Sequence, residues 1–170
     1  MNGQHGDSTR SVTAVNSAAD PGQPISHGPV PASAYHLSAD EGSEPDTYGR
    51  ASNPTWRQLE SALAQLEGAT TAVTFGSGMA AITAALRVLA TPGSVLVVPA
   101  DGYYQVRPFA AEKLAPLGIT VREAAAGEIC DAAEGADVVL AETPTNPALD
   151  VVDLHRLAGI CRRRGVRLLV

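Results

Sequence analysis

The chain has 170 residues, 45% of them hydrophobic, which is enough for one domain with a sizeable core. A formal net charge of -6 argues against a nucleic-acid-binding surface, because such a surface needs clustered basic residues. No apolar run approaches the roughly 20 residues of a membrane span. The N-terminus also lacks the basic start and apolar core of a secretory signal. We therefore expect a cytoplasmic protein with no nucleic-acid or membrane partner.

The cysteine content argues against a metal or disulfide scaffold. The sequence has two cysteines, Cys130 and Cys161, and neither belongs to a Cys-x-x-Cys pair. A zinc site or a disulfide framework is therefore not expected, and we predict no metal ligands.

The first third of the chain has few large apolar side chains. Residues 1–26 consist mainly of small and polar residues, which cannot bury enough surface to offset the entropy lost on ordering. We predict a disordered tail there. Residues 27–54 contain several prolines and are expected to form an extended arm that lies against another surface.

A helix is predicted to follow the arm. Thr55 is a candidate N-cap, Gln58 occupies the capping-box position, and Gly68 is a natural C-terminal stop. The apolar residues recur at helical spacing: Trp56, Leu59, Leu63 and Leu66.

From residue 70 onward the pattern alternates between strands and helices. Continuous apolar runs are typical of buried parallel strands, and this order predicts an α/β sheet with right-handed crossovers. The predicted strands are residues 72–75, 95–98, 119–121, 138–141 and 166–170, and the predicted helices are 79–90, 108–117 and the segment capped by Asp153 that runs through Arg164.

The turn Gly76-Ser77-Gly78-Met79 lies between a predicted strand and a predicted helix. A helix N-terminus presents free backbone N–H groups and partial positive charge, which suit a phosphate group. The spacing matches neither the dinucleotide-binding fingerprint, because residue 81 is alanine, nor the NTPase phosphate-binding loop. Taken alone, such a turn is as often purely structural, and a nucleotide-binding domain remains an alternative.

Two further polar loops follow predicted strands at the same edge of the sheet. One contains Asp101 and Tyr103, and the other begins with Glu142 and contains Asn146. Ligands of α/β sheets bind at the carboxyl ends of the strands. Three loops at one edge make a binding site more plausible than any of them alone.

Four motifs together resemble the cystathionine γ-lyase and γ-synthase family. This family contains pyridoxal-phosphate enzymes of sulfur amino acid metabolism with the type I aminotransferase fold. The resemblance covers about residues 27–170. It is carried by Tyr48-Gly49-Arg50 with Asn53-Pro54-Thr55, by Gly76-Ser77-Gly78-Met79-Ala80-Ala81-Ile82, by Asp101-x-Tyr103, and by Glu142-Thr143-Pro144-Thr145-Asn146-Pro147.

The resemblance implies a shared site for the cofactor phosphate. Gly78 and Met79 would offer backbone N–H groups, and Ser77 would line the turn. Tyr48 and Arg50 would reach the phosphate of a neighbouring subunit, so the protein would be a homo-oligomer, a dimer or tetramer. The chemistry is suitable, because a phosphate dianion favours an arginine fork and helix N–H groups. Without the other motifs, Tyr48 and Arg50 are equally well explained as a packed loop pair.

The resemblance also implies contacts to the cofactor ring. Tyr103 would stack on the pyridine ring and act as the catalytic proton carrier, and Asn146 would hydrogen-bond near the ring hydroxyl. Of the adjacent Tyr103 and Tyr104, one is expected only to pack. Asn146-Pro147 is also a common turn former.

The chain departs from the family pattern after the stacking tyrosine. Methionine γ-lyases carry a cysteine where this chain has Gln105, which counts against that activity. Many members have Gly-Gly at positions 104 and 105 and arginine at 108, where this chain has Tyr104 and Pro108, with Arg107 one residue early.

The family's Schiff-base lysine and the aspartate that pairs with the pyridine nitrogen lie beyond residue 170 in the family pattern. The single lysine here, Lys113, sits in a predicted helix and cannot replace that lysine. Residues 55–170 are therefore expected to form an incomplete large domain, and the 170-residue chain alone is expected to be inactive.

The predicted function of the complete protein is pyridoxal-phosphate-dependent transsulfuration, with γ-elimination from an amino acid such as cystathionine. Cystathionine γ-synthase and O-acetylhomoserine sulfhydrylase activities are alternatives. An alternative of another class is a non-catalytic, truncated homologue.

Overall fold

The computed structural model describes residues 6–14, 21–22, 24–26, 28–31, 33–39 and 45–170. The chain divides into two compact units, residues 1–74 and 75–170, which we describe separately. The predicted domain boundary lay at residue 55, whereas the division into units follows Thr74 and groups the first long helix with the arm.

The first unit contains α1 (Asp7–Thr13) and α2 (Pro54–Glu67). No element was predicted where α1 lies. The other parts of the predicted tail include residues 1–5, 15–20 and 23, which lie outside the described residues, so the tail stays a prediction. In the arm, residues 27, 32 and 40–44 also lie outside the described residues.

The N-cap of helix α2 lies two residues before Thr55, the predicted cap. Its N-cap is Asn53, whose side chain accepts a hydrogen bond from the Thr55 N–H at 2.8 Å, and Pro54 occupies the first helical position, where a missing N–H costs nothing. The Thr55 hydroxyl instead accepts a bond from the Val30 N–H at 2.9 Å. Gly68 ends the helix with a φ of 62°, as predicted.

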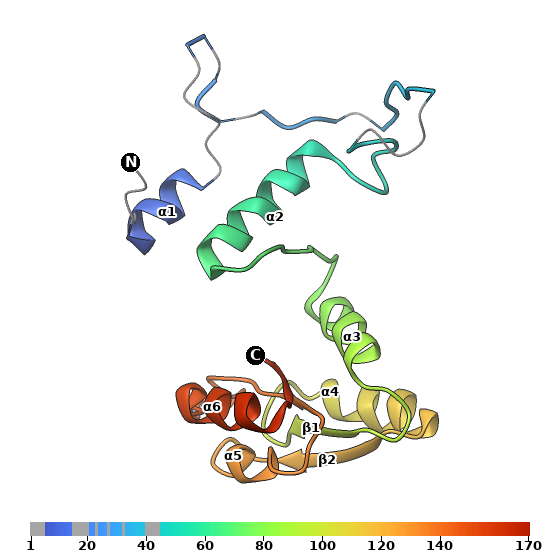
Figure 1. The fold of residues 1–170 in the computed structure, drawn as a ribbon, viewed down its shortest axis with the longest axis vertical. Helices are drawn as coiled ribbons and strands as arrows, with labels where there is room; N and C mark the ends of the chain where they lie inside the picture. The colour runs from blue at the N-terminus through green and yellow to red at the C-terminus, as the bar shows by residue number, and fades with distance from the viewer. Residues whose placement is uncertain (1–5, 15–20, 23, 27, 32, 40–44) are drawn as a thin grey trace. The chain divides into compact units, whose positions relative to one another are not determined.

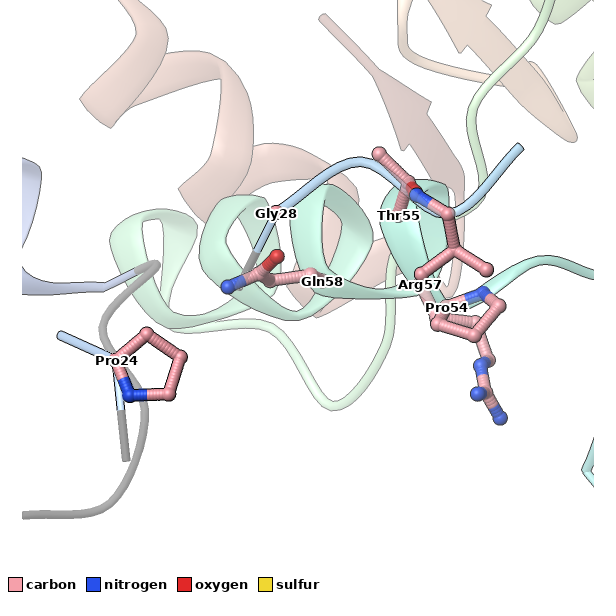
Figure 2. Close-up of a pocket in the computed structure, with 7 residues that line it drawn as sticks. Pro24, Gly28, Pro54, Thr55, Arg57 and Gln58 are labelled. Carbon is pink, nitrogen blue, oxygen red and sulfur yellow. The ribbon is translucent and has the colours of Figure 1, made fainter. Parts of the chain in front are cut away.

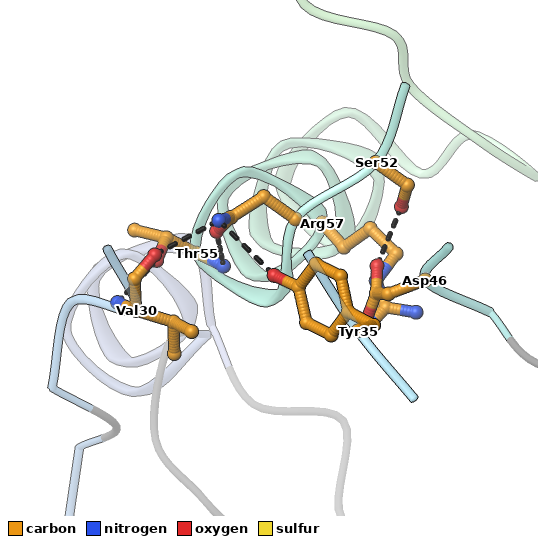
Figure 3. Close-up of polar contacts among 7 residues, drawn as sticks. Val30, Tyr35, Asp46, Ser52, Thr55 and Arg57 are labelled. Carbon is orange, nitrogen blue, oxygen red and sulfur yellow. Dashed lines mark hydrogen bonds and ion pairs between the residues drawn. The ribbon is translucent and has the colours of Figure 1, made fainter. Parts of the chain in front are cut away.

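Polar contacts tie the arm to the start of α2 (Figure 3). The Asn53 side-chain amide donates to the Val30 carbonyl at 2.8 Å. Asp46, which is 7% exposed, accepts from the Ser52 hydroxyl at 2.7 Å and pairs with Arg57. These bonds hold the turn that carries Tyr48 and Arg50 next to the helix N-terminus.

The second unit is a parallel α/β sheet of four strands in the order β2-β1-β3-β4. The strands are β1 (Val95–Pro99), β2 (Thr120–Ala124), β3 (Val138–Leu140) and β4 (Arg167–Leu169). The helices are α3 (Gly78–Leu89), α4 (Val106–Phe109), η1 (Ala110–Leu114), η2 (Ala115–Leu117), α5 (Ile129–Ala132) and α6 (Leu154–Arg164).

Helices cover both faces of this sheet (Figure 1). One apolar cluster joins Val97 and Val139 to α5 and α6, and includes the fully buried Leu157. The other joins Leu96, Val98 and their neighbours on β3 to α3, α4 and η1. Because successive strand residues point to opposite faces, strands buried on both faces are apolar throughout, as the sequence indicated.

The predicted strand at residues 72–75 is absent, and this prediction was wrong. A strand needs a neighbouring strand for its backbone groups, and none of the four strands of the described sheet pairs with this segment. The Thr74 N–H donates instead to the Glu60 carboxylate at 2.8 Å.

The predicted helix 108–117 begins at Val106 and changes its winding along its length. It is α-helical to Phe109, a π turn to Leu114 and a 3₁₀ turn to Leu117. Pro116 lacks the N–H that an α-helical turn would use, so regular winding cannot continue through it. The remaining predicted helices and strands are present, with ends that differ by at most three residues.

Candidate functional site

A cavity of about 480 Å³ lies in the second unit where α3 begins and where β1 and β3 end. Five of the seven predicted site residues line it, together with Ile82 and Glu142: Ser77, Gly78, Met79, Tyr103 and Asn146. The first three come from the start of α3, Tyr103 from the loop after β1, and Asn146 from the loop after β3. Parallel strands bring their carboxyl ends to one edge, which is why residues so distant in sequence meet there.

The N-terminus of α3 has free backbone N–H groups, which are chemically suited to an anion. Ser77 is the N-cap, and its hydroxyl oxygen accepts from the Ala80 N–H at 3.2 Å while its carbonyl accepts from the Ala81 N–H at 3.2 Å. The amides of Gly78 and Met79 precede these two and have no partner within the helix. Both residues line the cavity, at the positive end of the helix dipole.

Open space surrounds this helix start. A methyl group built on Gly76 or on Gly78 would meet no atom within 4 Å. The glycines therefore leave the backbone accessible to a ligand rather than serving a packing contact.

Tyr103 presents an aromatic ring to the cavity and is 36% exposed. Its neighbour Tyr104 is 60% exposed, and the two rings form an edge-to-face pair with centroids 5.1 Å apart. Tyr104 does not line the cavity and supports Tyr103 from the side.

The loop after β3 is held by its own polar groups. The buried Thr145 donates its N–H to the Asp150 carbonyl at 2.9 Å, and its hydroxyl accepts from the Asp150 N–H at 3.0 Å. The Thr143 hydroxyl accepts from the Val152 N–H at 3.0 Å. The Thr143–Pro144 and Asn146–Pro147 peptide bonds are both cis. These contacts set the position of Asn146 at the cavity.

Glu142 lines the cavity although it was not among the predicted site residues. The sequence identified it only as the first residue of its loop, and the structure places it in the cavity wall, where it accepts from the Tyr103 N–H at 2.7 Å. The available signal was its place directly after the end of a buried strand.

Tyr48 and Arg50 belong to the first unit. The Arg50 guanidinium lies over the Tyr48 ring, 4.8 Å from its centroid, and Tyr48 is 45% exposed. The two side chains therefore form one exposed cationic and aromatic pair. Their predicted contact to a neighbouring subunit stays a prediction.

A second cavity, also about 480 Å³, lies in the first unit beside α2 (Figure 2). Its lining comes from the arm and the first turns of the helix: Pro24, Gly28, Val30, Pro54, Thr55, Arg57 and Gln58. The one charged lining residue, Arg57, is already paired with Asp46. None of the predicted site residues lies there, so the cavity at α3 is the stronger candidate.

Other reactive groups lie away from the candidate site. Lys113 is on η1, with its side chain 64% exposed and 3.9 Å from Glu112. Cys130 and Cys161 are free and buried.

Among the described residues, no group of three or more acidic, cysteine or histidine side chains is placed to hold a metal ion. No helix of the described part of the chain is long and apolar enough to cross a membrane.

Residues 9–170 match the family described as Cys/Met metabolism PLP-dependent enzymes. The chain belongs to this family. A provisionally named cystathionine gamma-lyase of Streptomyces coelicolor is 42% identical over 167 residues, which are 94% of this chain and 42% of that protein. The cystathionine gamma-lyase of Bacillus subtilis is 35% identical over 72% of this chain and 33% of its own length.

Solved structures of the family have the same fold. Cystathionine gamma-synthase from Xanthomonas oryzae pv. oryzae, in complex with cystathionine, matches with a TM-score of 0.83 and 27% identity over 98% of this chain. A cystathionine gamma-lyase from Micromonospora echinospora matches with a TM-score of 0.77 and 31% identity, again over 98%. The chain spans 44% of each of these two, so it corresponds to a part of the fold of a Cys/Met metabolism enzyme.

The residues of the cavity fit the cofactor of this family. Pyridoxal phosphate has a phosphate dianion, a flat aromatic ring and a ring hydroxyl. The cavity offers helix N–H groups and a serine hydroxyl, the face of Tyr103, and the amide of Asn146. Its volume lies within the 300–1,000 Å³ that is typical of cofactor sites.

Proposed function

We propose that the complete protein is a pyridoxal-phosphate-dependent C–S lyase that carries out γ-elimination on an amino acid such as cystathionine. The observation that carries this proposal is the cavity at α3, where an anion-binding helix start, an aromatic ring and an amide converge. Cystathionine γ-lyases and γ-synthases are among the proteins most similar to this chain.

The phosphate would be held by the start of α3. The Gly78 and Met79 N–H groups donate to its oxygens, and the Ser77 hydroxyl adds a donor. Tyr48 and Arg50 complete the phosphate site from a neighbouring subunit, with Arg50 contributing charge and a fork of donors. The proposed protein is therefore a homo-oligomer, a dimer or tetramer, with sites shared between subunits.

The ring would be held by Tyr103 and Asn146. Tyr103 stacks on it and excludes water from that face, and Asn146 orients it through the ring hydroxyl. When bound, pyridoxal phosphate supplies an electron sink for the carbon that bears the amino group. The Tyr103 hydroxyl oxygen then holds and moves a proton during elimination.

This proposal is tested on the full-length gene product that contains these 170 residues. We expect a visible absorption band from bound cofactor and release of cysteine from cystathionine. Tyr103→Phe keeps the ring and removes the hydroxyl, so kcat falls roughly 10²–10⁴-fold, the usual contribution of general acid–base catalysis, while the band remains. Absence of both band and turnover in the unmodified protein would contradict the proposal.

Synthase chemistry is the nearest competing activity, because a γ-synthase shares the fold with a TM-score of 0.83. The same preparation is assayed with an O-activated homoserine and either cysteine or sulfide. If the protein joins cysteine to the activated homoserine faster than it cleaves cystathionine, the result indicates a γ-synthase. A preference for sulfide indicates an O-acetylhomoserine sulfhydrylase.

The 170-residue chain by itself is proposed to be inactive. Its single lysine, Lys113, is exposed on η1 and is not among the residues lining the cavity. We expect the isolated chain mixed with pyridoxal phosphate to give no borohydride-reducible band and no turnover. A band that borohydride removes would contradict this. A gene product that ends at Val170 and shows neither property would support the non-catalytic alternative.

The two free, buried cysteines support the proposal of a cytoplasmic location.

A further inference from the structure

The loop that carries Tyr103 is anchored where it leaves β1. The Ala100 N–H donates to the Ala124 carbonyl at 2.9 Å, and the Ala100 carbonyl accepts from Arg107 Nη1 at 2.7 Å. One carboxylate oxygen of Asp101 accepts from the Ala126 N–H at 2.9 Å. These bonds tie the first half of the loop to the end of β2 and to α4.

Glu142 ties the second half of the loop to the end of β3. Its Oε2 atom accepts from the Tyr103 N–H at 2.7 Å, across 39 residues of sequence. A charged acceptor makes this bond stronger than a bond between neutral groups. The backbone atom that is held belongs to the same residue that presents its ring to the cavity.

Gly102 makes this contact possible. A Cβ atom built on Gly102 would lie 2.7 Å from Pro99 Cγ and 2.8 Å from Glu142 Oε2. Both distances are shorter than van der Waals contact, and the proline ring has little freedom to move away. Any larger residue at position 102 would therefore push the carboxylate off the Tyr103 N–H.

We infer that Glu142 is the positioning residue for Tyr103: its carboxylate holds the Tyr103 backbone, and so sets the height and tilt of the ring that faces the cofactor. Gly102 is the partner that leaves room for it. This inference rests on the proposed function, in which the Tyr103 ring stacks on the cofactor. Glu142 acts as a hydrogen-bond acceptor here, so its oxygen atom is required and its charge is not.

The test compares three variants of the full-length gene product, Glu142→Ala, Glu142→Gln and Gly102→Ala, with a pair of control variants. The controls are Glu112→Ala, an exposed carboxylate on η1, and Gly127→Ala, at which an added Cβ meets no atom within 4 Å. For each we measure kcat, KM, the cofactor dissociation constant and the circular dichroism of the bound cofactor's visible band. The dissociation constant is measured by cofactor titration and the other quantities at saturating cofactor, all below the unfolding temperature.

A mispositioned ring changes chemistry and the chiral environment of the cofactor more than it changes phosphate binding. For Glu142→Ala and Gly102→Ala we expect kcat to fall roughly 10–100-fold, with an altered dichroism band. The cofactor dissociation constant should change less than about 3-fold, because the proposed phosphate contacts at the start of α3 do not involve the Tyr103 loop. Glu142→Gln retains an oxygen acceptor and restores most of kcat and the band shape, and both controls match the unmodified protein.

Two results would overturn the inference. An unchanged kcat and dichroism band in Glu142→Ala or Gly102→Ala would show that the bond does not position the ring. Equal loss in Glu142→Gln and Glu142→Ala would show that the negative charge is required and that an oxygen acceptor is not enough. If Glu142→Ala does not fold, Gly102→Ala takes its place in both comparisons. An unmodified protein without cofactor band or turnover would instead remove the proposed function, and this inference with it.

Discussion

Ser77 combines two roles that a pair of substitutions can separate. Its hydroxyl oxygen caps α3 through the Ala80 N–H, and the same side chain lines the cavity proposed for the phosphate. Ser77→Ala should lower the free energy of unfolding by about 1 kcal/mol, the usual cost of losing an N-cap. It should also weaken cofactor binding by a similar amount, about 1 kcal/mol for one hydrogen bond.

Ser77→Asp is the matched control, because aspartate caps a helix as well as serine does. Its negative charge would face the phosphate and repel it. We expect stability close to that of the unmodified protein, with cofactor binding weaker than in Ser77→Ala. Denaturant unfolding and cofactor titration give the two readouts. Tighter cofactor binding by Ser77→Asp would show that no anion lies at the start of α3.

Helix α6 shows how local signals determine an element at both ends. Asp153 Oδ1 accepts from the Arg156 N–H at 2.9 Å, and Gly165 ends the helix with a φ of 72°. Three arginines occupy the last turn, where positive charge is favourable against the helix dipole. One apolar side of the helix, including Leu157, packs on the sheet. Every signal agrees, so the helix was predicted with its cap.

We expect Asp153→Ala to lower the free energy of unfolding by about 1 kcal/mol through loss of this cap. Asp153→Asn keeps an oxygen acceptor at the same place and should retain the stability to within a few tenths of a kcal/mol. The midpoint of denaturant unfolding measures both. Equal loss in the two variants would mean that the carboxylate charge, rather than the capping bond, stabilises the helix.

The two thiols of the sheet core couple folding to pH. Burial raises the pKa of the Cys130 thiol above its ordinary value. Burial also raises the pKa of the Cys161 thiol, and the nearby Cys130 raises it further. A raised pKa means that the folded protein binds these protons more tightly than the unfolded chain does. Their stabilising contribution is complete below the ordinary thiol pKa, about 8.5, and is lost as the pH rises through the folded values.

The expected result is a free energy of unfolding that declines above about pH 8.5. A Cys130→Ala, Cys161→Ala double variant should decline less steeply, because only these two groups are removed. Denaturant midpoints between about pH 7 and pH 11 are measured for both proteins, and contributions common to the two cancel in the difference between them. Parallel profiles for the two proteins would contradict the prediction.

Local composition was enough to identify most elements of the sheet unit. Strands β1 and β3 are apolar throughout because helices cover both of their faces, and such runs are recognisable without a partner. The short helix α5 lacked any such signal, since only four residues form it. Residues 72–75 carried the signal of a strand and do not form one. Strand formation depends on a neighbour, and a local pattern does not contain that information.

Most of the residues that line the cavity were also predicted from local sequence. Gly76-Ser77-Gly78-Met79, Tyr103 and Asn146 were chosen from their motifs and from their places after strands, and the structure brings all but Gly76 into the wall of one cavity. The sequence by itself therefore determined the chemistry available, namely helix N–H groups, an aromatic ring and an amide. It also indicated the family to which the chain belongs.

Tertiary structure alone decided how these groups are held. The bond from the Tyr103 N–H to Glu142, the crowding at Gly102 and the bond from the Asn53 amide to the Val30 carbonyl all depend on which segments meet. Helix propensity and hydrophobic periodicity act over a few neighbouring residues, so a sequence records them directly. A contact between residues 103 and 142 exists only because parallel pairing places the ends of β1 and β3 side by side.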